Sequence, residues 1–336
     1  MLSWLAMRTI LILRFTVLLA SVGVVLAACG ESATDADSVA PDDSLPTIVV
    51  TSSVLGDVVG EMFGEHADMV TLMPPGVDPH DFQPSAKQAA ELTDADAIVV
   101  NGGGLEEGLV PIIEEAEHDG AAVCSALAGV TPLESEEADH TDEAHTHSSD
   151  AGGLDPHFFS DPGAMADAAS HLVDCITSAE PSLDHAGVRE HAAAYITDLR
   201  QHEEQMAVAL AAIPPEQRVV VSDHNSFAYF ADRYGFEVAG VISPGVSTHA
   251  EPSAADLAAL AEVMRERDIR VIVSESSVSN SLARTLAGEV GGVEVVELHT
   301  ETLAPNESQA SSSYIDMIRG NVDALVTAFE ASAQTL

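Results

Sequence analysis

Three histidines and one glutamate stand in short loops beside apolar, β-branched runs or turns of the sequence. His80 lies in MPPGVDPHDFQPS, His157 in LDPHFFSDP, His224 in SDHNSFAYFADRYG and Glu301 in ELHTETLAP. Two of the histidines end an Asp-Pro-His motif, whose proline stiffens the loop and restricts the imidazole. Three neutral imidazoles and one carboxylate suit tetrahedral Zn²⁺, whereas Mn²⁺ usually takes more oxygen ligands.

The repeated Asp-Pro-His motif has a second explanation, because Asp-Pro favours turns with or without a ligand. A zinc ion held by three histidines could also be catalytic, in which case a nearby general acid or base would be expected. Glu275 in VIVSESSV is the carboxylate that fits this role. The sequence contains neither H-E-x-x-H nor G-x-S-x-G, so a binding protein is favoured over an enzyme.

The elements that position these residues alternate between short β-branched runs and amphipathic stretches. The predicted strands are 47–54, 68–73, 97–102, 121–126, 218–223, 237–242, 270–275 and 293–298. This alternation predicts an α/β fold with mainly parallel sheets flanked by helices. Ligands of such sheets bind beyond the carboxyl ends of the strands, where the candidate residues lie.

A long Ala-rich stretch divides the pattern into two lobes. Apolar residues recur with a helical period from about Leu183 to Ala212, which predicts a helix of roughly 45 Å that runs along both lobes. We therefore expect an N-terminal lobe at 46–180, a rigid linking helix at 181–213 and a C-terminal lobe at 214–336. Ser253 and Asp256 form a predicted capping box for one helix of the second lobe.

The N-terminal residues are typical of a secreted lipoprotein. Arg8 and Arg14 precede an apolar run, and residues 1–28 are predicted to be a signal peptide. Leu-Ala-Ala-Cys resembles a bacterial lipobox, which predicts lipidation of Cys29, and a polar tether follows at 29–45. The location is then extracytoplasmic, at the cell membrane. A transmembrane anchor and an unmodified signal peptide are the alternatives.

The charge of the chain excludes nucleic acid as a partner. The formal net charge is −43, and Lys87 is the only lysine. Cys124 and Cys175 remain as two cysteines of the exported part, and the sequence leaves open whether they pair.

Residues 134–150 break the strand and helix pattern and contain His140, His145 and His147 among acidic and small polar residues. Such a segment can bind zinc weakly without folding, and we expect an accessory metal loop here. An acidic, solvated loop that happens to contain histidines is the alternative.

Six blocks of the sequence together resemble one protein family. They are PPGVDPHDFQPS, ADAIVVNGGGLE, LDPHFFSDP, SDHNSFAYFADRYGF, EPSAADLAAL and SYIDMIRGNVDAL, and the resemblance covers residues 47–330. It points to the metal-binding lipoproteins of bacterial zinc and manganese ABC importers, the cluster A-I or cluster 9 substrate-binding proteins. The resemblance implies a metal between two lobes joined by one long helix, and an ABC permease as partner.

The ligand positions of that family match four positions of this chain. His80 and His157 match the two histidines of the first lobe. His224 falls where zinc-type members have histidine and manganese-type members have a carboxylate. Glu301 falls where many relatives have aspartate, so the longer side chain leaves His299 or a water as alternative fourth ligands.

The expected function is that of an extracytoplasmic zinc-binding lipoprotein, a monomer that delivers Zn²⁺ to a permease. The His-rich insertion, which zinc-type members often carry, favours zinc. A manganese-binding importer lipoprotein is the alternative, and a zinc-dependent hydrolase or an adhesin is a more distant one.

Overall fold

The computed structural model describes residues 44–134, 153–305 and 311–334. The predictions for the signal peptide, for lipidation of Cys29 and for the loop histidines His140, His145 and His147 lie outside the described residues. In the part of the chain that is described, no helix has the length and apolar character that crossing a membrane requires.

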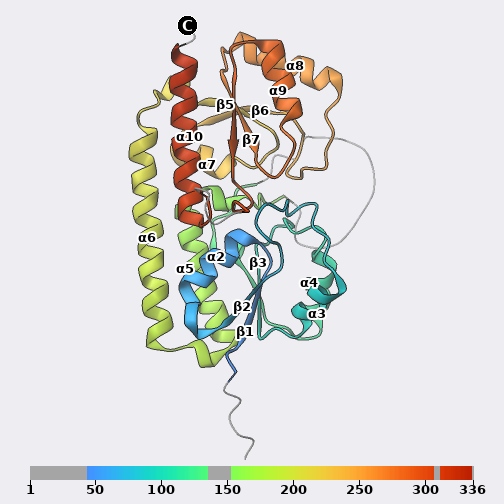
Figure 1. The fold of residues 1–336 in the computed structure, drawn as a ribbon, viewed down its shortest axis with the longest axis vertical. Coiled ribbons are helices and arrows are strands. Elements are labelled where there is room, and N and C mark those ends of the chain that lie inside the picture. Colours follow the sequence, from blue (N-terminus) through green and yellow to red (C-terminus); the bar gives the residue numbers. More distant parts are fainter. Residues whose placement is uncertain (1–43, 135–152, 306–310, 335–336) are drawn as a thin grey trace, which may run out of the picture. The chain divides into compact units, whose positions relative to one another are not determined.

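Two parallel four-stranded sheets form the centre of the two lobes (Figure 1). The first has the order β2-β1-β3-β4, with β1 Thr47–Val50, β2 Asp68–Thr71, β3 Ala97–Val100 and β4 Val123–Ser125. The second has the order β6-β5-β7-β8, with β5 Val219–Ser222, β6 Glu237–Val241, β7 Val271–Glu275 and β8 Glu294–Leu298. Every strand pair is parallel, so the predicted two-lobed α/β fold is confirmed.

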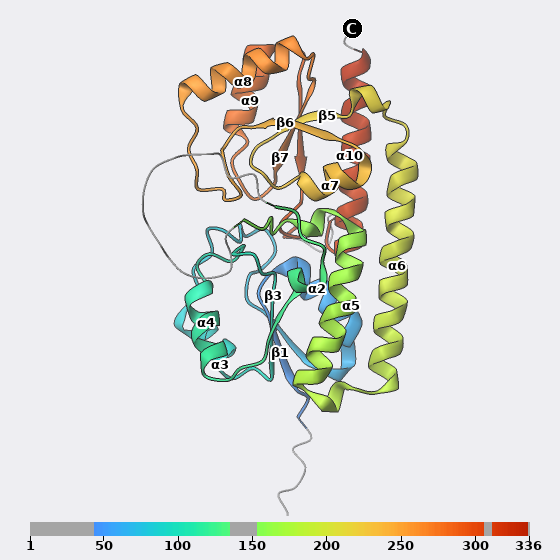
Figure 2. The same ribbon diagram turned by 180° about the vertical axis from the view of Figure 1, so that it is seen from behind.

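Helices cover both faces of each sheet, as Figures 1 and 2 show. The helices of the first lobe are α2 (Ser53–Phe63), α3 (Ala86–Thr93), α4 (Val110–His118) and α5 (Pro162–Ala179). Those of the second lobe are α7 (Ala228–Tyr234), α8 (Ala254–Glu266), α9 (Ser281–Val290) and α10 (Tyr314–Gln334). Ser253 and Asp256 form the predicted capping box at the start of α8.

Alternate residues of the strands enter different cores, as the two-residue period of a strand requires. In β1, Ile48 and Val50 belong to a large core that α2, α5 and α10 share, whereas Val49 packs with the residues of α3 and α4. In β7, Val273 lies in the same large core, whereas Ile272 faces α8 and α9. One apolar core therefore extends through both lobes and ties them together.

The linking helix α6 comprises Ala186–Leu210 and has 25 residues, so the predicted 30-residue helix was too long. A separate turn, Pro181–Leu183, precedes it, and His185 is extended at its N-cap. At the other end Pro214 disfavours helical geometry at Ile213. The helix still packs on α2 and α5 in one lobe and on α10 in the other (Figures 1 and 2).

Cys124 in β4 and Cys175 in α5 form a disulfide, a question that the sequence left open. Their Cα atoms are 5.9 Å apart, although 51 positions separate them in the sequence. The bond fastens α5, which packs on the linking helix, to the edge strand of the first sheet.

Reduction of this disulfide is expected to lower the free energy of unfolding by about 4 kcal/mol, because a loop of this length gains that much chain entropy when unfolded. Urea denaturation of oxidised and reduced protein measures the difference. A Cys124→Ala, Cys175→Ala variant that does not respond to reductant is the control. An equal denaturation midpoint for oxidised and reduced wild-type protein would refute the prediction.

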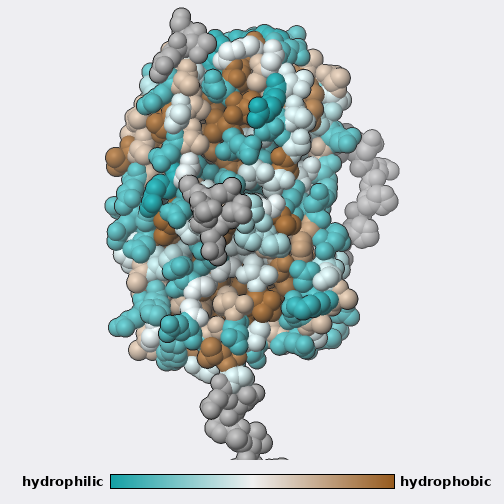
Figure 3. All heavy atoms as spheres, in the orientation of Figure 1, coloured by the Kyte–Doolittle hydropathy of each residue, from teal (hydrophilic) through white to brown (hydrophobic). Residues whose placement is uncertain are grey.

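Hydrophilic residues are spread over the whole of the face seen in Figure 3, and smaller apolar areas lie between them. This agrees with the large excess of acidic over basic residues in the sequence, 55 against 12. The negatively charged surface of the protein therefore attracts cations.

Candidate metal centre

His80, His157, His224 and Glu301 lie together and are all buried. His80 and His157 come from loops of the first lobe, and His224 and Glu301 follow strands β5 and β8 of the second. One potential ligand atom of each residue lies within 4.8 Å of the other three. The carboxyl ends of both sheets thus face the same place, between the lobes.

The distances around Glu301 are close to those of a tetrahedral site. Its Oε1 atom lies 2.7 Å from Nε2 of His224, 3.3 Å from Nε2 of His157 and 3.7 Å from Nε2 of His80. Ligand atoms at 2.0–2.1 Å from a tetrahedral zinc are about 3.3 Å apart. The hydrogen-bonded pair of His224 and Glu301 must open slightly to admit an ion.

Three buried polar atoms of this group have no hydrogen-bond partner among the described residues. They are Nε2 of His80, Nε2 of His157 and Oε2 of Glu301. A buried polar atom without a partner is costly and rare in folded proteins. A cation between these atoms would satisfy all three, which is the strongest structural sign of a metal site.

The Asp-Pro-His motif folds both histidine loops in the same way. The backbone N–H of His80 donates to Asp78 Oδ1, and that of His157 donates to Asp155 Oδ1, each at 2.9 Å. An aspartate that accepts the N–H two residues later forms an Asx-turn. The motif is therefore turn chemistry, and the same turn aims each imidazole at the group.

Each of the three imidazoles also has a carboxylate at its Nδ1 atom. The pairs are His157 with Asp155 at 2.7 Å, His224 with Asp223 at 3.1 Å and His80 with Glu107 at 3.3 Å. A carboxylate at Nδ1 fixes the ring and its tautomer and leaves Nε2 for a metal. Sequence reasoning did not assign this role to any of the three. The adjacent aspartates carried a signal for it, whereas Glu107 carried none.

The structure groups Glu301, not His299, with the three histidines. The Nδ1 atom of His299 is hydrogen-bonded to the hydroxyl of Ser276 at 2.8 Å. Glu275 accepts the backbone N–H of Thr300 at 2.9 Å and also its hydroxyl. Glu275 thus holds the turn that carries Glu301, which is a role in the scaffold and not that of a general acid or base.

Charges within the group shift the pKa values of His80, His224 and Glu301. Burial alone lowers the pKa of His80, but the hydrogen bond with Glu107 and the nearby carboxylate of Glu301 outweigh it and raise the pKa to about 9. Burial also lowers the pKa of His224, yet the charge of Glu301 and the bond to Asp223 raise it well above 6.5. Burial raises the pKa of Glu301, but the charge of His224, its hydrogen bond and the nearby imidazoles of His157 and His80 hold it well below 4.5.

A loop of the second lobe, residues 242–253 between β6 and α8, reaches across to the first lobe. The hydroxyl of Thr248 donates to Asp78 Oδ2 at 2.8 Å, and Nε2 of His249 lies 3.1 Å from the carbonyl oxygen of His80. Both contacts end on the loop that carries His80. The two lobes are therefore fastened directly beside the group.

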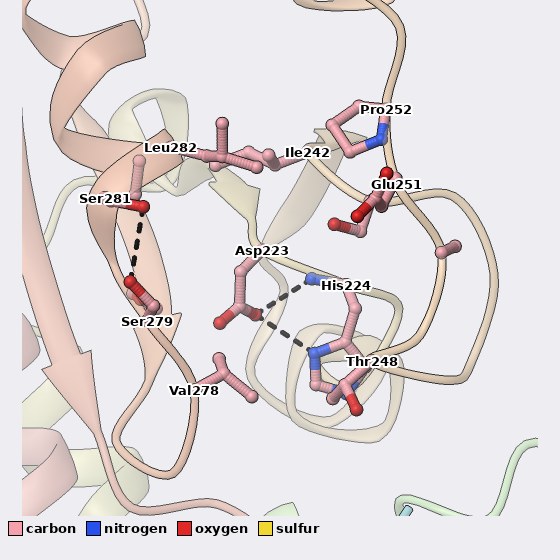
Figure 4. Close-up of a pocket in the computed structure, with 14 residues that line it drawn as sticks. Asp223, His224, Ile242, Thr248, Glu251, Pro252, Val278, Ser279, Ser281 and Leu282 are labelled. Carbon is pink, nitrogen blue, oxygen red and sulfur yellow. Dashed lines mark hydrogen bonds and ion pairs between the residues drawn. The ribbon is translucent and has the colours of Figure 1, made fainter. Parts of the chain in front are cut away.

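A cavity of about 260 Å³ lies in the second lobe and is bordered by Asp223 and His224 (Figure 4). Thr248 and Glu251 of the crossing loop form another part of its wall. In Figure 4, Asp223 accepts hydrogen bonds from both the backbone N–H and the ring of His224. The cavity is thus lined both by the crossing loop and by one member of the group.

Comparison with known proteins gives a consistent result. Residues 48–328 match the family model of the periplasmic zinc-uptake complex component A. The manganese-binding lipoprotein MntA of Halalkalibacterium halodurans is 27% identical over 93% of this chain and 97% of its own. The high-affinity zinc uptake system protein ZnuA of Bacillus subtilis is 28% identical over 90% of this chain and 93% of its own.

A solved structure, the periplasmic zinc-binding protein TroA of Treponema pallidum, has a TM-score of 0.74 at 25% identity and covers 85% of this chain and 99% of its own. These matches confirm the resemblance predicted from the sequence blocks. They place the protein among metal-binding components of transport systems and not among enzymes. The chain belongs to the family of periplasmic zinc-uptake complex components, the metal-binding substrate-binding proteins of zinc and manganese ABC importers.

Proposed function

We propose that this protein binds one Zn²⁺ ion through His80, His157, His224 and Glu301 and delivers it to an ABC permease. The observation that carries the proposal is the set of unpartnered, buried ring nitrogens of His80 and His157 beside the carboxylate of Glu301. Three nitrogen ligands and one oxygen ligand suit tetrahedral zinc. The zinc is cargo, so the site must both hold and release it.

Manganese is the second candidate, and one observation favours it. Oε2 of Glu301 has no hydrogen-bond partner among the described residues, so both carboxylate oxygens are available to a larger coordination shell. The relatives carry names of both kinds, zinc and manganese. Metal-stripped protein incubated with equimolar Zn²⁺ and Mn²⁺ is expected to retain zinc, as measured by elemental analysis. Retention of manganese would reverse the assignment.

The proposal also places the protein outside the cytoplasmic membrane, anchored through lipidated Cys29 and active as a monomer. His140, His145 and His147 would capture zinc weakly before it reaches the main site. Because one apolar core joins the lobes and α6 packs on both, binding is expected to involve small adjustments and movement of loops in place of a wide hinge closure.

The crossing loop is expected to control how fast zinc leaves. A Thr248→Val, His249→Ala variant loses the two hydrogen bonds that fasten the loop to the first lobe, each worth about 0.5–1.5 kcal/mol. The loop then opens more often, and zinc release to an excess of chelator should accelerate roughly 5- to 100-fold in a stopped-flow measurement. The tight site still binds one zinc at equilibrium.

Ser279→Ala is the matched control, since Ser279 lines the same cavity and bonds only to Ser281 in the described chain. Its zinc release should equal that of wild type. Equal release rates for the loop variant and wild type would show that the ion leaves by another route.

A further inference from the structure

Three other histidines gather at the end of the first lobe where α6 begins. His66 ends a short turn, Gly64–His66, that follows α2, while His185 is the N-cap of α6 and His191 lies in its second turn. The ring centroids of His66 and His185 are 4.7 Å apart, and those of His66 and His191 are 5.8 Å apart. The three histidine pairs of the metal centre have centroid distances of 5.7, 5.9 and 5.3 Å. Two ring pairs of this second cluster are thus as close as the pairs of the metal centre, but its three residues do not bring their ligand atoms within 4.8 Å of one another in the described chain.

Gly187 provides a small space that two of these rings share. A Cβ atom placed on Gly187 would lie 3.3 Å from Nδ1 of His185 and 3.4 Å from Nε2 of His66. Two ring nitrogens of different residues therefore border one point on the surface of α6. An ion near that point could bind both nitrogens once the exposed side chains rotate toward it.

The ring nitrogens of this cluster are free to bind a ligand. In the described residues, none of the six ring nitrogens of His66, His185 and His191 takes part in a hydrogen bond or an ion pair. His202 shows the contrast, because its Nδ1 lies 2.8 Å from the carbonyl of Asp198 and its Nε2 lies 3.0 Å from Arg319. His202 is a surface histidine with its own partners, and the three clustered ones have only one another.

Solvent reaches the cluster, and the surface favours cations. His185 and His191 are exposed and His66 is half-buried. The nearby cation Arg189 is paired with Asp184 at 2.7 Å, which offsets its charge. The formal charge of −43 further raises the concentration of cations at the surface. Imidazoles are suitable ligands for Zn²⁺, Cu²⁺ and Ni²⁺.

We propose that His66, His185 and His191 form a second, surface site for Zn²⁺, separate from the centre between the lobes. It binds more weakly than that centre, because its rings are exposed and have no carboxylates at Nδ1 to orient them. Water completes the coordination. The bound ion joins the turn after α2 to the start of α6 and so fastens the linking helix at its first turn.

Zinc titration of a His140→Ala, His145→Ala, His147→Ala variant tests the proposal, since it removes the loop histidines that would obscure a weak site. The full-length, metal-stripped protein is expected to take up one zinc tightly and a second one more weakly. Adding His66→Ala and His191→Ala should remove the second equivalent and spare the first. Adding His118→Ala, an exposed histidine of α4, should leave both equivalents.

Gly187→Ala provides a variant that keeps all three histidines and adds a good helix residue. Its Cβ atom fills the space between the two nitrogens, so it should weaken the second binding event at least several-fold without affecting the first. Anomalous diffraction at the zinc edge should show an ion about 2.0–2.1 Å from these ring nitrogens. Failure to find a second equivalent, or its survival in the His66→Ala, His191→Ala variant, would show that the rings only pack against one another.

Discussion

A His80→Ala, His157→Ala variant is expected to lose tight zinc binding, with an affinity roughly 10⁴-fold below that of wild type. Four-ligand zinc sites bind with about 10–16 kcal/mol, so each ligand contributes roughly 3 kcal/mol and two contribute about 6 kcal/mol. Both imidazoles are buried, with unpartnered Nε2 atoms at the centre of the site. No other histidine of the described chain is grouped with His224 and Glu301 to replace them.

Calorimetry on metal-stripped protein measures this loss, and circular dichroism verifies that the variant is folded. An Asp155→Asn variant gives a graded comparison, because it keeps the ligand His157 but weakens the group that orients its ring. Its affinity should fall about 10- to 100-fold. His118→Ala on the surface should bind as wild type does. If the double variant still bound one zinc with wild-type affinity, the assignment of His80 and His157 as ligands would be wrong.

Much of the fold and of the site could be predicted because the relevant patterns are local. Runs such as AIVV and VIVSE have the β-branched composition of buried strands, and both became strands with every residue buried. The two Asp-Pro-His motifs act within three residues, through a turn that the aspartate itself closes. His224 was found because it follows directly after a strand end.

The features that sequence reasoning missed or left open depend on contacts between distant residues. Glu107 meets His80 across 27 positions, and nothing in either segment indicates the other. The Cys124–Cys175 disulfide and the contact of Thr248 with Asp78 span still more of the chain. The choice between Glu301 and His299 depended on which side of one turn faces the centre. Glu275 decides it by binding the backbone of Thr300, a role that its sequence position did not reveal.

Zinc affinity is expected to rise with pH, by at least about 10-fold from pH 7 to pH 8. In the metal-free protein the pKa of His80 is raised to about 9, and that of His224 is raised well above 6.5. Zinc binds only the neutral imidazole, so each binding event releases at least the proton of His80 while the pH stays below about 9. Glu301 stays ionised throughout, because its pKa is held well below 4.5.

The stability of the metal-free protein should change in the opposite direction. Since the folded-state pKa of His80 lies above its ordinary value, its contribution is complete below about pH 6.5 and is lost as the pH rises through about 9. Roughly 3 kcal/mol of unfolding free energy is then lost between these limits. The free energy of unfolding of zinc-loaded protein should not fall in this way, because the bound ion has already replaced the protons.

Calorimetry in buffers of different ionisation enthalpy counts the released protons, and urea denaturation at pH 6.5 and 9.5 follows the stability. A Glu301→Gln variant removes an anion that raises both pKa values, although Glu107 also raises that of His80, so it should release fewer protons and show a flatter stability profile. Glu91→Gln, a surface carboxylate paired with Lys87, is the control. A zinc affinity that did not change between pH 7 and pH 8 would contradict the prediction. It would mean that the imidazoles are already neutral in the metal-free protein and that Glu301 does not hold protons on them. Fewer released protons from the Glu301→Gln variant would show that Glu301 holds the protons of the histidines in the metal-free protein, which makes proton release a measure of the contact between Glu301 and the histidines.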